Sequence, residues 1–181
     1  MKRVVISGLG VISPLGLTLK ETWPNVLAGN SGVTRISSFD PSRLPVQIAA
    51  EVKGFNPETV MDAKEARRTT RFIQLAVAAA KEALSDAGID TARESERIGC
   101  SIGVGIGAIE FIHDTVVSLS KDGPRRISPF FIPFPLPIWL PGWSPILLIS
   151  KAPIFARLLP VRVAPMLLVK LFCLSKTIWP I

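Results

Sequence analysis

Two cysteines and one histidine are the side chains in this chain best suited to nucleophilic or acid–base chemistry: Cys100, Cys173 and His113. A catalytic cysteine needs a helix N-terminus or a neighbouring cation to stabilise its thiolate. Cys100 instead falls inside a predicted buried strand, where a free cysteine behaves as a small hydrophobic residue. His113 lies on a predicted helix and is interpreted as a surface or packing residue. The two cysteines match neither a disulfide framework nor a metal-binding spacing, so no catalytic set, metal site or cofactor is predicted.

Two glycine-rich stretches follow predicted strands and invite comparison with nucleotide-binding loops. The first, SGLGVISPLG at 7–16, lacks the G-x-G-x-x-G pattern because position 13 is a serine. The second, GVGIGAIE at 103–110, lacks the Gly-Lys-Ser/Thr ending of a phosphate-binding loop. The first is interpreted as a turn that lets strand and loop pack closely, and the second as a place where the backbone passes close to another segment or ligand.

Positive charge gathers at the start of the longest predicted helix, in KEARR at 64–68 together with Arg71. A solvated helix face explains such a cluster. The alternative is a docking patch for an acidic partner, which charge would steer towards it.

The elements that must position these residues alternate between strands and helices, which indicates an α/β fold. Strands are expected at 3–9, 46–52 and 96–107, helices at 18–29, 62–89 and 108–123, and a loop at 31–45. The first and last of these strands are apolar enough to be buried, and the second alternates like an edge strand. The helix over 62–89 has the clearest periodicity and stops at Gly88. Its many alanines predict close packing against another layer.

The composition changes abruptly after residue 122. Residues 123–181 contain no Asp or Glu and 11 of the 16 prolines, and their seven cations account for the whole formal charge of +7. Those cations are dispersed in apolar sequence, so nucleic-acid binding is not predicted. The frequent prolines predict no regular element over 132–181. Residues 127–150 are uncharged and long enough to span a bilayer, but six prolines argue against a helix there.

Six segments in series resemble the beta-ketoacyl-ACP synthase II family of condensing enzymes. They are RVVISGLGVISPLG, AGNSGVTRISSFD, AAEVKGFNPE, KEARRTTRFIQLAVAAAKEALSDAG, RIGCSIGVGIG and GPRRISPFFIP. The resemblance covers residues 1–133 in family order and implies a partial thiolase-like fold, the N-terminal part of its first α/β half. It also implies decarboxylative condensation of an acyl thioester with malonyl-ACP in fatty acid biosynthesis. That chemistry uses a cysteine at a helix N-terminus, two histidines and a lysine.

The next landmarks of that family are missing from residues 134–181: Asn-Met-Ala-Ala-Gly, Lys-Gly-Pro-Asn and the nucleophile motif Ala-Cys-x-x-Gly. Read one base out of register, 137–142, 150–154 and 159–171 can encode all three in order. This agreement predicts that one lost base shifts the frame near Pro133–Phe134. Residues 1–133 are then a partial synthase domain, and 134–181 an irregular, non-native tail that is disordered or poorly packed. Resequencing codons 130–136 would distinguish a sequencing error from a lesion in the gene.

The resemblance further implies site residues and partners. Lys64, Arg67 and Arg68 match the basic patch that docks acyl carrier protein, while Ile106 and Phe131 match positions near the acyl pocket. Because the nucleophile motif, the two histidines and the lysine are not in this chain, we expect it to be catalytically inactive. Homodimer formation is an expectation for the intact family.

Two further functions stay open from the sequence: a non-catalytic fragment that binds carrier protein or a subunit, and a small protein that contacts membranes through its tail. The N-terminus has only a short apolar run and no cleavage site after it, which predicts a cytoplasmic location.

Overall fold

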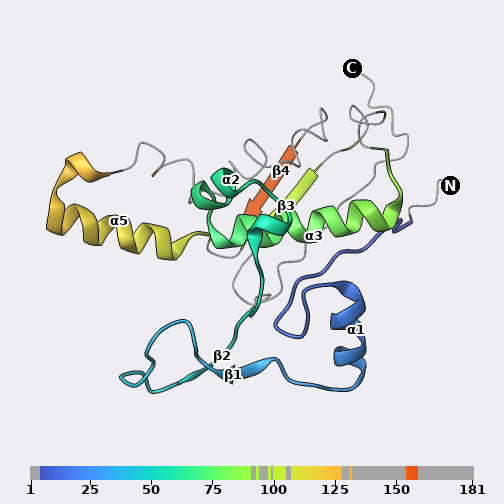
Figure 1. The fold of residues 1–181 in the computed structure, drawn as a ribbon, viewed down its shortest axis with the longest axis horizontal. Helices are drawn as coiled ribbons and strands as arrows, with labels where there is room; N and C mark the ends of the chain where they lie inside the picture. Colours follow the sequence, from blue (N-terminus) through green and yellow to red (C-terminus); the bar gives the residue numbers. More distant parts are fainter. Residues whose placement is uncertain are drawn as a thin grey trace.

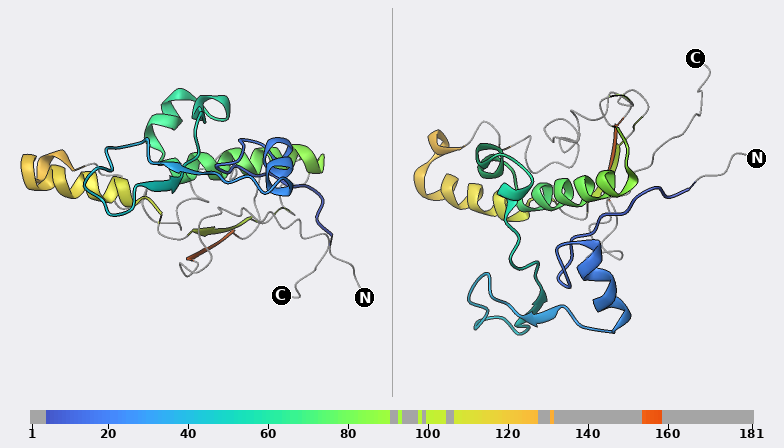
Figure 2. Two further views of the ribbon diagram at one scale, coloured as in Figure 1. Left: turned by 90° about the horizontal axis from the view of Figure 1, so that it is seen from below. Right: turned by 45° about the vertical axis from the view of Figure 1, so that its right-hand side comes forward.

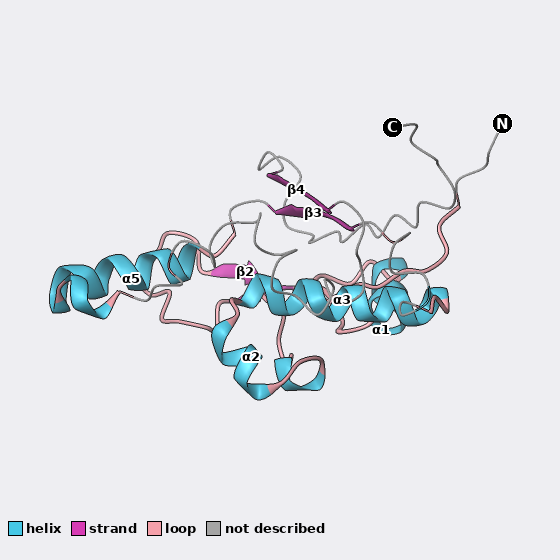
Figure 3. Ribbon diagram, turned by 90° about the horizontal axis from the view of Figure 1, so that it is seen from above, coloured by secondary structure: helices cyan, strands magenta, loops and turns pink. Residues whose placement is uncertain are grey.

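The structure is a computed structural model that describes residues 5–90, 93, 98, 100–104, 107–127, 131 and 154–158. Helix α3 (Arg71–Ala87) runs through the middle of this part of the chain (Figure 1). Helix α2 (Ala63–Arg68) lies on one side of α3, and strands β3 (Cys100–Val104) and β4 (Ile154–Leu158) lie on the other (Figures 2 and 3). Helix α5 (Ile109–Asp122) extends beyond the N-terminal end of α3.

Helix α3 carries most of the buried residues in the described part of the chain. Ala76, Val77 and Ala80 have no exposed surface, and Ile73 and Leu84 are also buried. Alanine has the highest helix propensity, and its short side chain lets neighbouring backbone approach closely. The alanines therefore favour both the formation of α3 and its close packing. The helix ends at Gly88, which takes the left-handed conformation with φ +61°. The predicted C-terminal stop is confirmed.

The prediction of one continuous helix over 62–89 is wrong at its first turns. Thr69 and Thr70 have extended backbones, with ψ +148° and +157°, and they separate α2 from α3. The hydroxyl of Thr69 donates a hydrogen bond of 2.9 Å to the carbonyl oxygen of Glu65. A β-branched residue with such a local bond competes well with helical continuation, and two in succession stop the helix.

The predicted buried strand at 3–9 is also wrong for its described part. Residues 5–12 are in no strand, and Val5 and Ile6 are 76% and 80% exposed. Where this segment ends, two backbone N–H groups bond to side chains of α3 instead of to a neighbouring strand. The N–H of Leu9 donates to the carboxylate of Asp86 at 2.9 Å, and that of Val11 donates to Glu82 at 2.8 Å.

The glycines of the N-terminal segment lie directly on the backbone of α3. A Cβ added at Gly8 would be 2.3 Å from the carbonyl oxygen of Ala83, and one at Gly10 would be 2.0 Å from that of Ala79. Heavy atoms do not approach so closely, so only glycine fits. The interpretation of SGLG as a close backbone approach is confirmed, as is the close packing expected of the alanine-rich helix.

Helix α1 (Leu19–Leu27) follows this segment as predicted. Thr18 is its N-cap and accepts a hydrogen bond from the N–H of Glu21, and Gly29 beyond its end has φ +70°. Two short 3-10 helices, η1 (Pro57–Thr59) and η2 (Pro124–Arg126), connect the larger elements.

Strands β1 (Val33–Arg35) and β2 (Ile48–Ala50) form an antiparallel pair that lies below α3 in the view of Figure 1. The predicted strand at 46–52 is therefore confirmed over a shorter length. The prediction that 31–45 is a loop is wrong for Val33–Arg35. This three-residue strand exists through pairing with a partner 15 residues away, because Arg35 lies opposite Ile48 and Val33 opposite Ala50. Local composition does not report such pairing.

Glu51 follows β2 and binds the loop after β1 through two consecutive serines. Its carboxylate accepts bonds from the hydroxyl groups of Ser38 at 2.6 Å and Ser37 at 2.7 Å, and from the N–H of Ser37 at 2.9 Å. These bonds, the Ser38 hydroxyl first, lower the pKa of Glu51 from 4.5 to about 2. Hydrogen bonds to the charged form of a carboxylate stabilise that form.

We expect the Glu51 carboxyl to titrate near pH 2 in an NMR titration of the folded chain. Since the pKa is lowered on folding, the stabilisation is complete above pH 4.5 and is lost as the pH falls from 4.5 to about 2. Ser38→Ala is expected to move the pKa back towards 4.5, whereas Ser42→Ala, in the same loop, is expected to leave it unchanged. An ordinary pKa for Glu51 in the unmodified chain would contradict the hydrogen bonds described.

Strands β3 and β4 pair in parallel, with Cys100 opposite Ile154 and Val104 opposite Leu158. The prediction of a strand within 96–107 is confirmed over five residues. The absence of regular structure expected over 132–181 is wrong for β4. A physical reason is visible in the sequence: residues 154–159 are free of proline between Pro153 and Pro160, and they are apolar enough for a strand. The rest of the predicted tail lies outside the described residues.

The helix predicted at 108–123 is confirmed as α5, which begins after Ala108 and ends before Gly123. Across the residues that the structure describes, every helix is too short or too polar to cross a bilayer.

Candidate functional site

Three cations on α2 face solvent because the helix has only one side against the protein. Ala66 is 9% exposed and faces the body of the chain. Lys64, Arg67 and Arg68 are exposed. Two of them lie in the last turn of α2, where positive charge is favourable because the helix dipole is negative at that end. We call Lys64, Arg67 and Arg68 the basic face.

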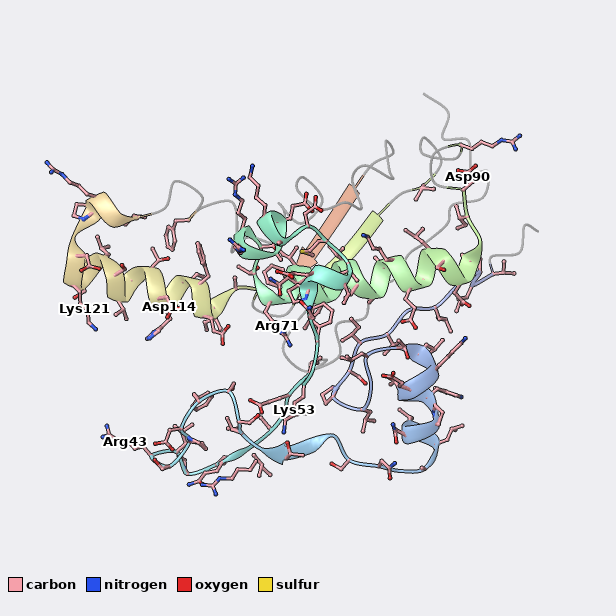
Figure 4. The ribbon with its side chains drawn as sticks, viewed as in Figure 1. Arg43, Lys53, Arg71, Asp90, Asp114 and Lys121 are labelled. Carbon is pink, nitrogen blue, oxygen red and sulfur yellow. The ribbon has the colours of Figure 1, made fainter. Side chains whose placement is uncertain are left out.

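Arg71 is exposed like the basic face, but its guanidinium is bonded within the chain. Its guanidinium donates to the carbonyl oxygens of Val52 at 3.0 Å and Phe55 at 3.4 Å. It also lies over the ring of Phe55, 5.2 Å from the centroid, in a cation–π contact. Figure 4 shows Arg71 at the start of α3, beside the segment that follows β2. Arg71 therefore ties that segment to α3.

Lys81 is a second cation with a backbone partner. It projects from α3, and its ammonium group donates to the carbonyl oxygen of Val60, just before α2. By contrast, no hydrogen bond joins the side chain of Lys64, Arg67 or Arg68 to any other described residue. The basic face is thus distinguished from its cationic neighbours by being unengaged within the part of the chain that the structure describes.

The two predicted acyl-pocket positions have different outcomes. Phe131 is half-buried and its ring lies against Phe111 of α5, with centroids 6.3 Å apart and an angle of 31° between the ring planes. Ile106 lies outside the described residues. Their assignment to an acyl pocket stays a prediction.

Of the residues considered for catalysis, Cys100 and His113 lie on different elements, β3 and α5, and Cys173 lies outside the described residues. Cys100 is the first residue of β3, and the next described helix, α5, begins at Ile109, so no helix N-terminus starts at this cysteine. His113 is exposed on α5, which confirms its interpretation as a surface residue. Among the described residues no group of three His, Cys, Asp or Glu side chains could hold a metal ion.

Two functional side chains were missed by the sequence analysis, Gln74 and Glu82. Gln74 is buried on α3, and both of its amide bonds go to the end of α2. Glu82 accepts the N–H groups of Val11 and Leu19 at 2.8 Å each. A polar residue within an apolar, alanine-rich helical face is the signal that could have identified both, because burial without a partner is costly.

The fold is that of a ketosynthase, and it is only part of one. The chain superposes on the ishigamide ketosynthase/chain length factor with a TM-score of 0.73 and 27% identity, covering 88% of this chain and 40% of that one. It also superposes on a ketosynthase solved with its type II polyketide synthase carrier protein, with a TM-score of 0.64 at 20% identity over 84% of this chain and 41% of that chain. The α/β, partial thiolase-like fold implied by the sequence resemblance is therefore confirmed.

The sequence comparison specifies the family. Residues 1–153 match the N-terminal domain of the beta-ketoacyl synthases, and the chain belongs to that family. It is 47% identical to 3-oxoacyl-[acyl-carrier-protein] synthase 2 of Coxiella burnetii over 133 residues, which are 73% of this chain and 32% of that protein. It is 44% identical to the enzyme of the same name from Staphylococcus aureus strain COL over 153 residues, 84% of this chain and 37% of that protein.

These relatives are about three times as long as the part of them that this chain matches. The family match also continues to residue 153, which is 20 residues past the predicted change of reading frame. The frame change after residue 133 remains a prediction.

Proposed function

We propose that this chain retains the carrier-protein docking face of a beta-ketoacyl-ACP synthase without its condensing chemistry. The observation that carries the proposal is the unengaged basic face of α2. Lys64, Arg67 and Arg68 are exposed and make no hydrogen bond to the described residues, while Arg71 and Lys81 have backbone partners. Free cations on a rigid element suit an acidic protein partner, because charge complementarity accelerates encounter and selects the partner.

The relatives' names support the identity of that partner. Both enzymes are named as synthases of a 3-oxoacyl group carried on acyl carrier protein. The solved ketosynthase at 20% identity is described in complex with its own acyl carrier protein. Acyl carrier protein is therefore the partner that we propose for the basic face, with fatty acid biosynthesis as the process to which the lineage belongs.

The absence of condensing activity follows from the chemistry of the chain's two cysteines. A condensing cysteine must be a thiolate at the moment of acyl transfer, which a helix N-terminus or nearby cations favour. Cys100 begins a strand, and Cys173 lies outside the described residues and in no Ala-Cys-x-x-Gly motif. The one histidine, His113, is exposed on α5. With one histidine in the sequence, the pair of histidines that the family resemblance implies for decarboxylation of malonyl-ACP is incomplete.

The docking proposal is tested by titrating the full chain with acyl carrier protein. Arg67→Glu/Arg68→Glu is expected to weaken binding by about tenfold or more, because each reversal replaces an attraction by a repulsion. Salt is expected to weaken binding by the unmodified chain, since exposed charges are screened. The matched control is Lys20→Glu/Arg43→Glu, which changes the net charge equally at exposed cations on α1 and in the loop after β1.

Equal binding by the two double variants would refute the docking proposal. The same preparation, given acyl-ACP and malonyl-ACP, is expected to form no condensation product, with an intact relative as the positive control. Product that depends on the chain would refute the second half of the proposal.

A further inference from the structure

Helix α2 has only six residues, so its last turn depends on bonds from outside the helix. A helix leaves its final carbonyl groups without intrahelical partners, and isolated helices of this length are not stable in water. The N–H of Thr69 donates to the carbonyl oxygen of Glu65 at 2.9 Å, which closes one turn. The carbonyl oxygens of Ala66 and Thr69 require other donors.

Gln74 supplies those donors from α3. Its Nε2 atom donates to the carbonyl oxygen of Ala66 at 2.9 Å and to that of Thr69 at 3.1 Å. A glutamine amide has two hydrogens, and both are used here. Gln74 is 8% exposed and its neighbour Ile73 is 6% exposed, so the amide works in an environment where an unmade hydrogen bond is costly.

The two residues whose carbonyl oxygens accept bonds from Gln74 lie directly before and directly after the two arginines of the basic face. Arg67 and Arg68 lie between Ala66 and Thr69 in the chain, and neither arginine side chain is bonded to a described residue that could hold it. The backbone that carries them is consequently oriented by Gln74. Lys64 lies about one turn earlier and is not between Ala66 and Thr69.

We propose that Gln74 is the positioning residue of the basic face: by binding Ala66 and Thr69, it holds the turn that presents Arg67 and Arg68 to an acidic carrier protein. The inference rests on the proposed docking function, and it adds the residue that sets the orientation of Arg67 and Arg68. Gln74 touches no carrier protein itself, and it acts through the backbone of α2.

The size of the effect follows from the population of the ordered turn. If only one-tenth of the molecules keep the turn in its docking conformation, the apparent affinity falls about tenfold. Gln74→Met keeps the length and approximate volume of the side chain but removes both donors. It leaves the carbonyl oxygen of Ala66 with only the long bond of 3.5 Å from the Thr69 hydroxyl.

The experiment compares Gln74→Met with the unmodified full chain by carrier-protein titration and by backbone hydrogen exchange. We expect about tenfold weaker binding and faster exchange of the Thr69 amide, with the amides of Val77 and Ala80 in α3 unchanged. Gln47→Met is the matched control, because Gln47 is a half-buried glutamine that accepts a 3.5 Å bond from Arg35 far from α2. It is expected to change neither measurement.

Introducing Gln74→Met into the Arg67→Glu/Arg68→Glu chain separates positioning from general stability. If Gln74 acts through the arginines, the third substitution weakens binding no further. An unchanged Thr69 exchange rate, or equal acceleration throughout α3, would overturn the inference. If the unmodified chain does not bind carrier protein, the docking proposal fails, and the exchange comparison still decides whether Gln74 orders α2.

Discussion

Gly10→Ala is expected to destabilise the folded chain by about 3 kcal/mol, at the upper end of the usual cost of overpacking. The added Cβ would lie 2.0 Å from the carbonyl oxygen of Ala79 and 2.6 Å from the backbone nitrogen of Ala83. Both atoms belong to the backbone of α3, which cannot rotate away as a side chain could. Residue 10 must therefore move off the helix.

Moving residue 10 also disturbs its neighbour, because the N–H of Val11 donates to Glu82 at 2.8 Å. The free energy of unfolding is measured by urea denaturation followed by circular dichroism. Gly54→Ala is the control, since a Cβ there meets nothing within 4 Å although φ is +73°. A cost of about 1 kcal/mol is expected from that backbone strain alone. Equal destabilisation by the two substitutions would show that residues 8–11 do not lie against α3.

Glu82→Ala is expected to destabilise the chain by about 3 kcal/mol, because two hydrogen bonds to one charged group are lost together. One carboxylate oxygen accepts the N–H of Val11 and the other accepts the N–H of Leu19, the first residue of α1. The Leu19 bond also places negative charge at the N-terminus of α1, where the helix dipole favours it. Glu82 is half-buried, so water replaces the lost bonds only in part.

A graded series makes this prediction specific. Glu82→Gln keeps one accepting oxygen and is expected to cost about half as much as Glu82→Ala. Asp86→Ala removes one exposed bond of 2.9 Å, to the N–H of Leu9, and is expected to cost about 1 kcal/mol. Urea denaturation gives the three values, and hydrogen exchange at Val11 and Leu19 locates the loss. An alanine variant as stable as the glutamine variant would argue against two simultaneous bonds.

Helices were predictable where the pattern of residues is local. The ends of α1 follow from Thr18 and Gly29, and the end of α3 follows from Gly88. The break at Thr69 and Thr70 was not predicted, because the competing bond to Glu65 is visible only in three dimensions. Helical periodicity reports which face is buried, and it does not report a short interruption.

Strands were predictable only in part, because a strand requires a partner. The apolar run at 3–9 looks like a buried strand, yet its described residues are in no strand, and the N–H groups of Leu9 and of Val11 beyond it bond to carboxylates of α3. β1 gave no sequence signal, and β4 was not predicted although its stretch is apolar and free of proline; each pairs with another segment. Pairing depends on residues distant in sequence, which no local window contains.

The candidate site was likewise predictable only in part from the sequence. Residue types and the family resemblance placed Lys64, Arg67 and Arg68 on a basic helix, and the structure shows all three exposed on α2. The sequence could not separate them from Arg71, which differs only in having the carbonyl oxygens of Val52 and Phe55 within reach. Nor could it identify Gln74, whose role depends on two carbonyl groups five and eight residues earlier.

The sequence by itself determined the family of the chain, the positions of its main helices and the change in composition after residue 122. Those features depend on residue order and local periodicity, and both can be read from the sequence without knowledge of the fold. Only the tertiary structure decided which cations are free, why Gly8 and Gly10 must be glycine, and which polar side chains of α3 hold α2 and the N-terminal segment. The physical reason is that each of these depends on a backbone group brought near by folding, and hydrogen bonds and steric contacts act over distances of only a few ångströms.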